Sequence, residues 1–534
     1  MKHLSHIITI LLLFLLAQSA SSQSLQPKND NNQALIEDYE YFIEQLEVIH
    51  PNPYSAFGGE AGFRKKVDSL RFVLEEKENL DKEYLQRQVS QLLIPLHDGH
   101  TRCGYMNYGQ EQEQRFLPIN LHAMTEGFYV CGGATDYEAL LGAQLIKVGG
   151  VSIDDLLDRI ALLAPAENRF GLYAKLLESR LCSGALKLLL EDFEGEQVEM
   201  QFLTREGRDS CFMIPLYTPD EIRQLKGVFT STDNRFPTKN LAYQWTDKQR
   251  GVMTFRCNSI ISRDCLSFMR DNGMEYQSIL ERAWGDTPFD SIPTIASRFG
   301  TMLEEMKEND AQHLIIDLRG NGGGWTPIVY ATLYQLFGDE FLCKDLGIQY
   351  ETKLSEPYLQ INNTTLDRFN ADRGTCYKLG DMIRNTDGMG VAQINDSIRQ
   401  QIIDSYVCLD KAMLSQQQGD PLYRPKHIYV VTDQETFSAA FHYAFMLWKM
   451  GATLVGVPSS QAPNTYMEST EFVLPNTGIP CSVSNSIQRF LPADDPRAQV
   501  FWPAWIPSYE DYKRYNFDLQ SDLLYILDHL SAYK

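Results

Sequence analysis

The stretch LIIDLRGNGGG, residues 314–324, decides the fold class of this chain. Its apolar first half is typical of a short strand buried in a sheet. Its second half has four glycines in five positions, so the backbone can turn sharply with its amides uncovered by side chains. Amides exposed at the end of a strand can bind an anion or a developing oxyanion. A plain glycine-rich turn is the alternative, whereas the glycine spacing of a phosphate-binding loop is absent.

A second buried strand, IYVV at residues 428–431, leads into the turn TDQETFSAA at 432–440. A helix is predicted to begin at Ser438, and the small residues Ala439 and Ala440 leave space around this serine. The positive end of a helix dipole favours an alkoxide and a nearby oxyanion, and the Ala439 amide is expected to point the same way. The alternative interpretation is an ordinary serine N-cap.

Strands and helices alternate from about residue 240 onward, which predicts an α/β layered domain over residues 240–534. The segment 325–427 separates two of the buried strands of this domain. Because it is too long for a plain connection, we expect it to hold an inserted lid or subdomain.

Two smaller domains are predicted before the α/β domain. Residues 30–112 show helical periodicity, and the turn HPNPY at 50–54 ends the first helix because proline resists helical continuation. Residues 113–225 are strand-rich, and GAQLIKVGGV at 142–151 reads as a strand and a tight turn. Ser152 then caps a helix. This order of strand, glycine turn and capped helix resembles half of a PDZ domain, in a degenerate form.

The N-terminus predicts export. Lys2 precedes an apolar run at 7–16, and small and polar residues follow at 17–23. This order is typical of a secretory signal peptide, which we place at residues 1–22. A retained N-terminal anchor is the alternative. No later segment approaches the length of a membrane span, so we expect a periplasmic or extracellular protein without a span after signal removal.

Composition excludes several function classes. A chain of 534 residues is expected to hold two to four domains. Its formal net charge of −22 makes nucleic acid and anionic membrane surfaces poor partners. The ten cysteines include no CxxC, and no HExxH or zinc-like Cys/His spacing occurs, so we expect no metal or other cofactor. Export permits disulfides, but no pairing and no oligomeric state can be deduced from the sequence.

A nucleophilic serine needs a base. A lysine base from the following strand is excluded, because Lys449 lies roughly 16 Å along the helix from Ser438 and the next lysine is Lys513. Two of the histidines, His313 and His427, precede their strands and therefore belong to the far edge of the sheet. His442 lies one helical turn beyond Ser438 and remains a candidate. The remaining candidates, His97 and His100, lie in a turn of the first domain, which sequence spacing alone cannot bring to the serine.

The motifs together resemble one known family. DLRGNGGG at 317–324, TFSAA at 436–440 and GVPSS at 456–460 resemble the S41 family of serine peptidases, the C-terminal processing or tail-specific proteases. LHDGHT at 96–101, after HPNPY, looks like the tricorn-core-like branch. The resemblance implies an N-terminal helical domain, a degenerate PDZ-like domain and a ClpP/crotonase-like α/β catalytic domain.

Carried over residue by residue, the resemblance places the nucleophile at Ser438 and the oxyanion hole at the backbone amides of Gly322, Gly323 and Ala439. The base in the tricorn-like branch is the histidine of DGHT, here His100. The third member there is a carboxylate near the C-terminal end, before a Pro-Asp.

This chain reads WPAW at 502–505 and lacks that aspartate; Asp494 and Asp495 lie nearby without a secure alignment, so the third member is unknown. The implied function is a serine endopeptidase that hydrolyses peptide or protein substrates through an acyl-enzyme. The alternative is a non-catalytic carrier of peptides or lipophilic ligands on the same fold.

Overall fold

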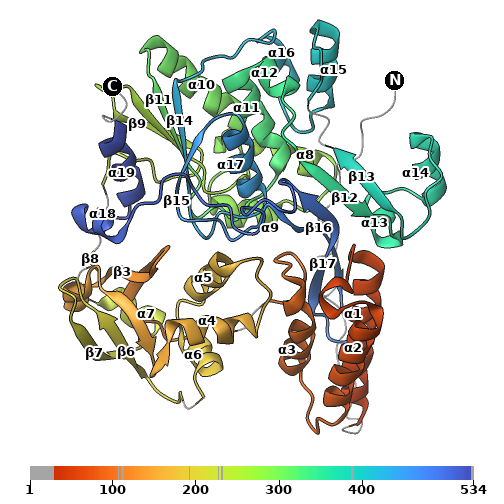
Figure 1. Ribbon diagram of the computed structural model, residues 1–534, viewed down its shortest axis with the longest axis vertical. Helices are drawn as coiled ribbons and strands as arrows, with labels where there is room; N and C mark the ends of the chain where they lie inside the picture. Colours follow the sequence, from red (N-terminus) through yellow and green to blue (C-terminus); the bar gives the residue numbers. More distant parts are fainter. Residues whose placement is uncertain are drawn as a thin grey trace.

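The computed structural model describes residues 29–105, 108–109, 113–191, 193–225, 228–229, 233–386 and 390–530, and the predicted signal peptide lies outside them. The chain forms three lobes, visible in Figure 1. We name them the helical lobe (29–105), the sheet lobe (113–225 with 228–229) and the upper lobe (233–530). None of the described helices is long and apolar enough to cross a membrane.

The helical lobe packs three helices around one apolar core, whose members include Tyr39, Phe42, Leu46 and Phe63. The helices are α1 (Asn29–Ile49), α2 (Glu60–Glu75) and α3 (Lys82–Leu93). Apolar residues at spacings of three and four on α1 face this core, as the periodicity predicts. The core also contains Leu474, Ile479 and Val483, which belong to a hairpin of the upper lobe. The helical lobe is therefore completed by a segment distant in sequence.

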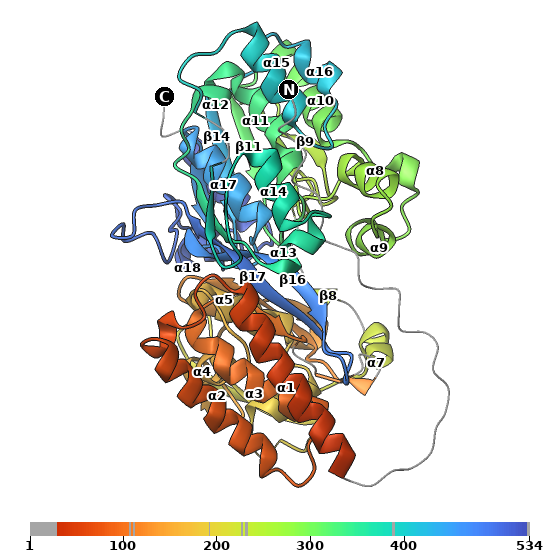
Figure 2. The same ribbon diagram turned by 90° about the vertical axis from the view of Figure 1, so that its right-hand side faces the viewer.

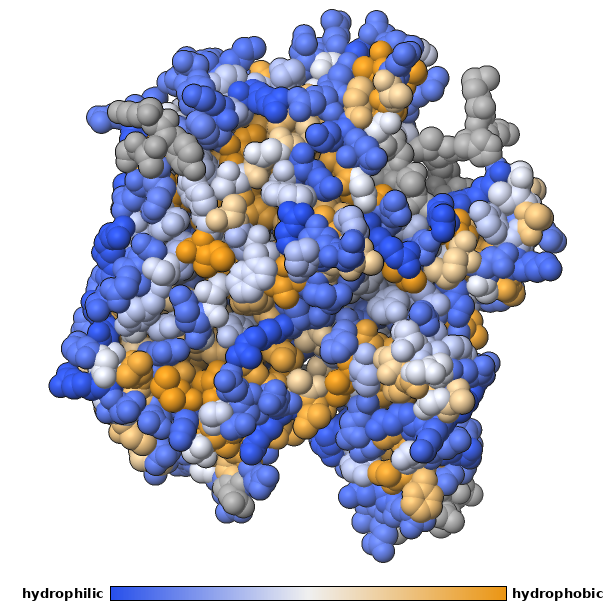
Figure 3. Space-filling view, viewed as in Figure 1, coloured by the Kyte–Doolittle hydropathy of each residue, from blue (hydrophilic) through white to orange (hydrophobic). Residues whose placement is uncertain are grey.

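The sheet lobe is a mixed unit with a sheet in the order β2-β3-β4-β6-β7, to which β5 and β8 add at β4 and β3. Its strands are β2 (Ile119–Met124), β3 (Gly127–Ala134), β4 (Gln144–Val148), β5 (Val151–Ser152), β6 (Gln197–Leu203), β7 (Asp209–Pro215) and β8 (Val228–Phe229). Its helices are α4 (Ile153–Ala161), α5 (Arg169–Glu178), α6 (Ser183–Leu189) and α7 (Pro219–Gln224). Ser152 caps α4 through the Asp155 amide, at 3.1 Å. Figure 3 shows hydrophobic side chains on the face of this lobe. The large hydrophobic residues exposed in the lobe include Leu162, Leu188, Phe212 and Met213.

The upper lobe is built on a five-stranded sheet in the order β15-β14-β11-β10-β9, parallel except for β9. The strands are β9 (Ala242–Asp247), β10 (Val252–Arg256), β11 (His313–Asp317), β14 (His427–Thr432) and β15 (Thr453–Gly456). Alternate residues face opposite sides, so that Ile316 joins the core that includes α10 (Ile295–Glu308), α11 (Val329–Phe337) and α17 (Ala439–Lys449). Ile315 packs on the other side with α19 (Ser521–His529). Burial on both faces explains the apolar run that precedes the glycine turn.

A second sheet connects the lobes. It contains β12 (Gln349–Lys353), β13 (Met382–Thr386) and the long hairpin β16 (Asn464–Val473) and β17 (Pro480–Arg489). The hairpin runs from the upper lobe down to the helical lobe (Figures 1 and 2). There β17 pairs with the short strand β1 (Arg102–Cys103), which directly follows the LHDGHT turn. The turn that carries His100 is thus joined to the upper lobe by strand pairing.

The segment 325–427, expected to hold an insertion, divides between two roles. Its first part, α11 and α12 (Asp339–Cys343), belongs to the main core of the upper lobe. A small separate core of Leu354, Leu359, Phe369 and Ile383 then joins β12 and β13 to α13 (Glu356–Ile361) and α14 (Leu366–Arg373). The remaining helices of the upper lobe are α8 (Arg263–Asp271), α9 (Gln277–Trp284), α15 (Asp396–Ser405), α16 (Lys411–Ser415) and α18 (Tyr509–Arg514).

Candidate active site

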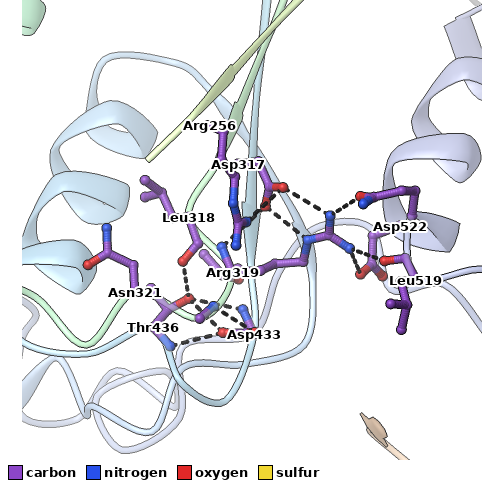
Figure 4. A network of polar contacts seen from close by, with 12 residues as sticks. Arg256, Asp317, Leu318, Arg319, Asn321, Asp433, Thr436, Leu519 and Asp522 are labelled. Carbon is purple, nitrogen blue, oxygen red and sulfur yellow. Dashed lines mark hydrogen bonds and ion pairs between the residues drawn. The ribbon is translucent and has the colours of Figure 1, made fainter. Parts of the chain in front are cut away.

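A buried charge network fixes the glycine turn at the end of β11 (Figure 4). Asp317 pairs with Arg319 at 2.9 Å and with Arg256 at 2.8 Å. Arg319 continues to Asp522 of α19 at 3.1 Å and to the Leu519 carbonyl at 2.9 Å. Burial raises the pKa of Asp317, but the two arginines outweigh this and hold it at about 2. The ionised network therefore locks the glycine turn to the C-terminal segment.

The glycine turn and the turn after β14 lie side by side, because parallel neighbouring strands end at the same edge of the sheet. The Asp433 carboxylate accepts a hydrogen bond from the Gly320 amide at 2.9 Å. The Phe437 amide donates to the Asn321 carbonyl at 3.0 Å. These bonds bring the residue before Ser438 directly against the glycine turn.

Ser438 has a backbone conformation that serine rarely adopts, with φ 54° and ψ −126°. Strain of this kind costs about 1–3 kcal/mol and is concentrated at functional sites. The Ser438 amide donates to Gln461 Oε1 at 2.5 Å, which helps to hold the strained backbone. Its side chain makes no capping hydrogen bond to α17, although it stands at the N-cap position. The ordinary N-cap interpretation therefore lacks the bond on which it depends.

Gly323 makes the closest approach to the serine. A Cβ atom built there would lie 2.8 Å from the Ser438 Cβ, and its φ of 110° is unfavourable for other residues. The Gly323 amide already donates to Asn321 Oδ1 at 2.9 Å. Among the described residues, the amides of Gly322 and Ala439 have no hydrogen-bond acceptor. These two amides are the ones free to bind an oxyanion, whereas Gly323 is needed for its lack of a side chain.

The LHDGHT turn is organised by the buried carboxylate of Asp98. It accepts from the His100 amide at 2.9 Å, the Thr101 amide at 3.2 Å and the Ser484 hydroxyl of β17 at 3.0 Å. His50, from the HPNPY turn, lies 3.4 Å away through Nε2. Burial raises the pKa of Asp98, but its interactions with His50, His100 and Thr101 outweigh this and hold it at about 2. One ionised carboxylate thus joins the two motifs of the helical lobe to β17.

This turn brings His100 to the edge that carries Ser438. The His100 ring stacks on Phe437, with centroids 4.7 Å apart and planes at 24°. Gly99 allows this approach, since a Cβ there would lie 3.1 Å from the Phe437 ring and 2.9 Å from Glu167 Oε1. The structure therefore brings His100, the serine turn and the glycine turn together from two lobes.

Glu167 of the sheet lobe completes the arrangement from a third direction. Its Oε1 lies 3.5 Å from His100 Nδ1, and its Oε2 accepts from the Ala462 amide at 2.8 Å. Burial lowers the pKa of His100, but Glu167, with Asp98 and Glu468, outweighs this, so the pKa is raised. A buried carboxylate in contact with a histidine fixes the orientation of the ring and favours its protonated form.

His442, which spacing alone could not dismiss, lies in a different environment. Its Nε2 is 2.7 Å from Gln488 Oε1, and its Nδ1 is 3.5 Å from the Thr326 hydroxyl. Burial lowers its pKa to about 4, so the ring is neutral at physiological pH. His313 and His427 stack on each other at the start of their strands, away from the serine edge as predicted.

Part of the chain matches a known protein family. Residues 287–486 match the sequence model of Peptidase family S41. The matched residues include the glycine turn and Ser438. The chain is a serine-type peptidase with a mixed α/β fold. No curated protein sequence matches this chain.

Solved structures align with this chain over most of its length. Mature CPAF matches with a TM-score of 0.57 at 16% identity, covering 93% of this chain and 98% of that chain. Mature CPAF complexed with lactacystin gives 0.56 at 15% identity, with 94% and 99% covered. A photosystem II D1 C-terminal processing protease gives 0.34 at 12% identity, with 86% and 88% covered.

Two polar residues of the site were missed by sequence reasoning. Glu167 stands alone in a loop before α5, and Gln461 follows GVPSS without a motif of its own. Neither carries a periodic or spacing signal. Asp495, weighed as a nearby carboxylate, pairs instead with Arg497 at 2.7 Å.

Proposed function

We propose that this chain is an exported serine endopeptidase in which Ser438 is the nucleophile, His100 the general base and Glu167 the orienting carboxylate. One observation carries the proposal. A strained serine without its capping bond lies beside Gly323, and the residue before it stacks on a histidine that a buried carboxylate contacts. An ordinary helix start needs none of these features.

The proposed reaction follows from this geometry. His100 removes the Ser438 hydroxyl proton while the oxygen attacks the peptide carbonyl. The free amides of Gly322 and Ala439 bind the oxyanion that develops. His100, held by Glu167, then returns the proton to the departing amine, which leaves an acyl-enzyme. Water, deprotonated by the same histidine, releases the second product and restores the serine.

The proposal also assigns roles to the lobes. Residues 30–112 would form a helical domain that supplies the base, and residues 113–225 a PDZ-like domain that supplies the carboxylate. Residues 240–534 would form the catalytic domain, with a signal peptide at 1–22. The substrate is a peptide or protein, and the apolar surface of the sheet lobe is suited to contact an unfolded chain.

The test combines labelling with peptide cleavage. A serine-reactive phosphonate should form one adduct, and mass spectrometry should locate it on Ser438. Peptides blocked at both ends should be cleaved internally by the wild type and left intact by Ser438→Ala. An adduct on another serine, or full cleavage by Ser438→Ala, would refute the nucleophile. Cleavage restricted to peptides with a free end would refute endopeptidase action. Absence of both adduct and cleavage would favour the carrier alternative.

A further inference from the structure

Two buried cysteines face each other where the helical lobe meets the hairpin. Cys103 of β1 and Cys481 of β17 are partners in the antiparallel register, and their sulfur atoms lie 3.6 Å apart. Both side chains are in the core that the hairpin shares with α1, α2 and α3. We propose that Cys103 and Cys481 form a disulfide bond that joins the turn carrying His100 to the upper lobe.

The backbone geometry suits such a bond. The Gly104 amide donates to the Pro480 carbonyl at 2.8 Å, so the adjacent pair, Cys103 and Cys481, occupies a non-hydrogen-bonded position of the ladder. Alpha carbons at such positions are about 4.5 Å apart. Disulfides span about 4.4–6.8 Å between alpha carbons. The two sulfurs can therefore be joined by side-chain rotation without moving the strands.

The proposed oxidant is a disulfide, either a small molecule such as glutathione disulfide or the disulfide form of a thiol oxidoreductase in an oxidising compartment. One cysteine thiolate attacks it and releases one thiol. The second cysteine then attacks the mixed disulfide and releases the other. The protein loses two hydrogen atoms, and the oxidant becomes two thiols. The neighbouring thiol and burial raise the pKa of Cys103 well above its ordinary value, so this exchange belongs to the folding chain, before β1 closes on β17.

The bond would strengthen the junction on which the base side depends. β1 begins directly after His100 and Thr101, and β17 carries Ser484, which holds Asp98. The loop closed by the bond would run from the end of the helical lobe through the sheet lobe and most of the upper lobe, and long closed loops restrict the unfolded chain strongly. The bond itself does not depend on the proposed catalytic roles.

The experiment uses the full chain, refolded with glutathione disulfide and alkylated under denaturing conditions before any reduction. We expect a linked peptide pair containing Cys103 and Cys481, while the exposed Cys211 and Cys376 are alkylated. Alkylation of both Cys103 and Cys481, or linkage of either to another cysteine, would overturn the proposal.

Thermal unfolding gives a second measurement. The oxidised wild type should unfold at a higher temperature than its reduced form, and Cys103→Ala with Cys481→Ala should show no response to the oxidant. A Cys211→Ala variant is the matched control and should respond as the wild type does. An equal response of the double variant would overturn the proposal. Because neither readout uses peptidase activity, failure here and failure of the proposed function are distinguishable.

Discussion

The turn of the proposed nucleophile is held within one sheet, whereas the turn of the proposed base is held between three lobes. Ser438 and Gly323 follow adjacent parallel strands, and the Asp317–Arg319 network fixes the edge beneath them. His100 reaches this edge only because β17 pairs with β1 and Glu167 enters from the sheet lobe.

The positions of Ser438 and His100 therefore depend on different sets of contacts. The geometry of the nucleophile depends on local backbone and one core, so it should survive changes at the lobe contacts. The geometry of the base depends on contacts between lobes, so it should be the part that conditions and substitutions disturb.

Gly323→Ala should cause the largest loss on the nucleophile side. The new methyl group would clash with Ser438 and strain a backbone with φ of 110°. Because the clash would shift Ser438 relative to the amides proposed to bind the oxyanion, we expect kcat/KM to fall by about 10³-fold. Gly322→Ala is the matched control, because its Cβ would meet open space and its amide is retained. Steady-state kinetics on a blocked peptide measure both, and equal rates for the two variants would contradict the assignment.

Asp98→Asn should cause the largest loss of stability on the base side. Its carboxylate accepts several hydrogen bonds in a fully buried position, so we expect the free energy of unfolding to fall by about 3 kcal/mol. The folded-state pKa of about 2 is depressed, so this stabilisation is present above the unfolded pKa and is lost as the pH falls through about 2. Denaturant unfolding measures it, with the exposed Asp136→Asn as a control expected to change little.

Glu167→Gln should reduce kcat/KM by about 10²-fold by weakening general base catalysis. The base must be neutral, so the acidic limb of the pH profile reports the raised pKa of His100. Removing the Glu167 charge leaves Asp98 and Glu468 facing His100, and the pKa should fall. The limb should therefore move to lower pH. A reduced rate with an unmoved limb would indicate a structural role only.

Gln461→Met should have the smallest effect of the four. It removes the acceptor of the Ser438 amide while keeping the side-chain volume. We expect kcat to fall about tenfold with KM nearly unchanged, in line with the loss of one hydrogen bond. Gln461→Glu keeps an acceptor oxygen and should recover part of the rate. A change confined to KM would place Gln461 in substrate binding instead.

The sequence was informative wherever the signal was local. The buried strand before the glycine turn, the strand before Ser438 and the helical face of α1 follow from patterns of neighbouring residues. The family resemblance placed the amides of both Gly322 and Gly323 in the oxyanion hole. In the structure the Gly323 amide instead donates a hydrogen bond to Asn321 Oδ1.

The rest depends on contacts that no local pattern records. Glu167 and Gln461 are single polar residues in loops, and only the packing of the lobes gives them partners. The hairpin β16–β17 completes the core of a lobe far from it in sequence. The segment 325–427 was expected to hold an inserted unit; α13 and α14 have a small separate core with β12 and β13, whereas α11 and α12 pack in the main core.

The rate at which an activated ester acylates Ser438, measured across pH, tests the base assignment. His100→Asn is compared with His97→Asn, a change in the same turn at an exposed residue, and with His442→Asn on the nucleophile helix. We predict that His100→Asn abolishes the acidic limb and most of the rate, while the other two variants keep the wild-type limb. A wild-type profile in His100→Asn would contradict the assignment, as would loss of the limb in His442→Asn.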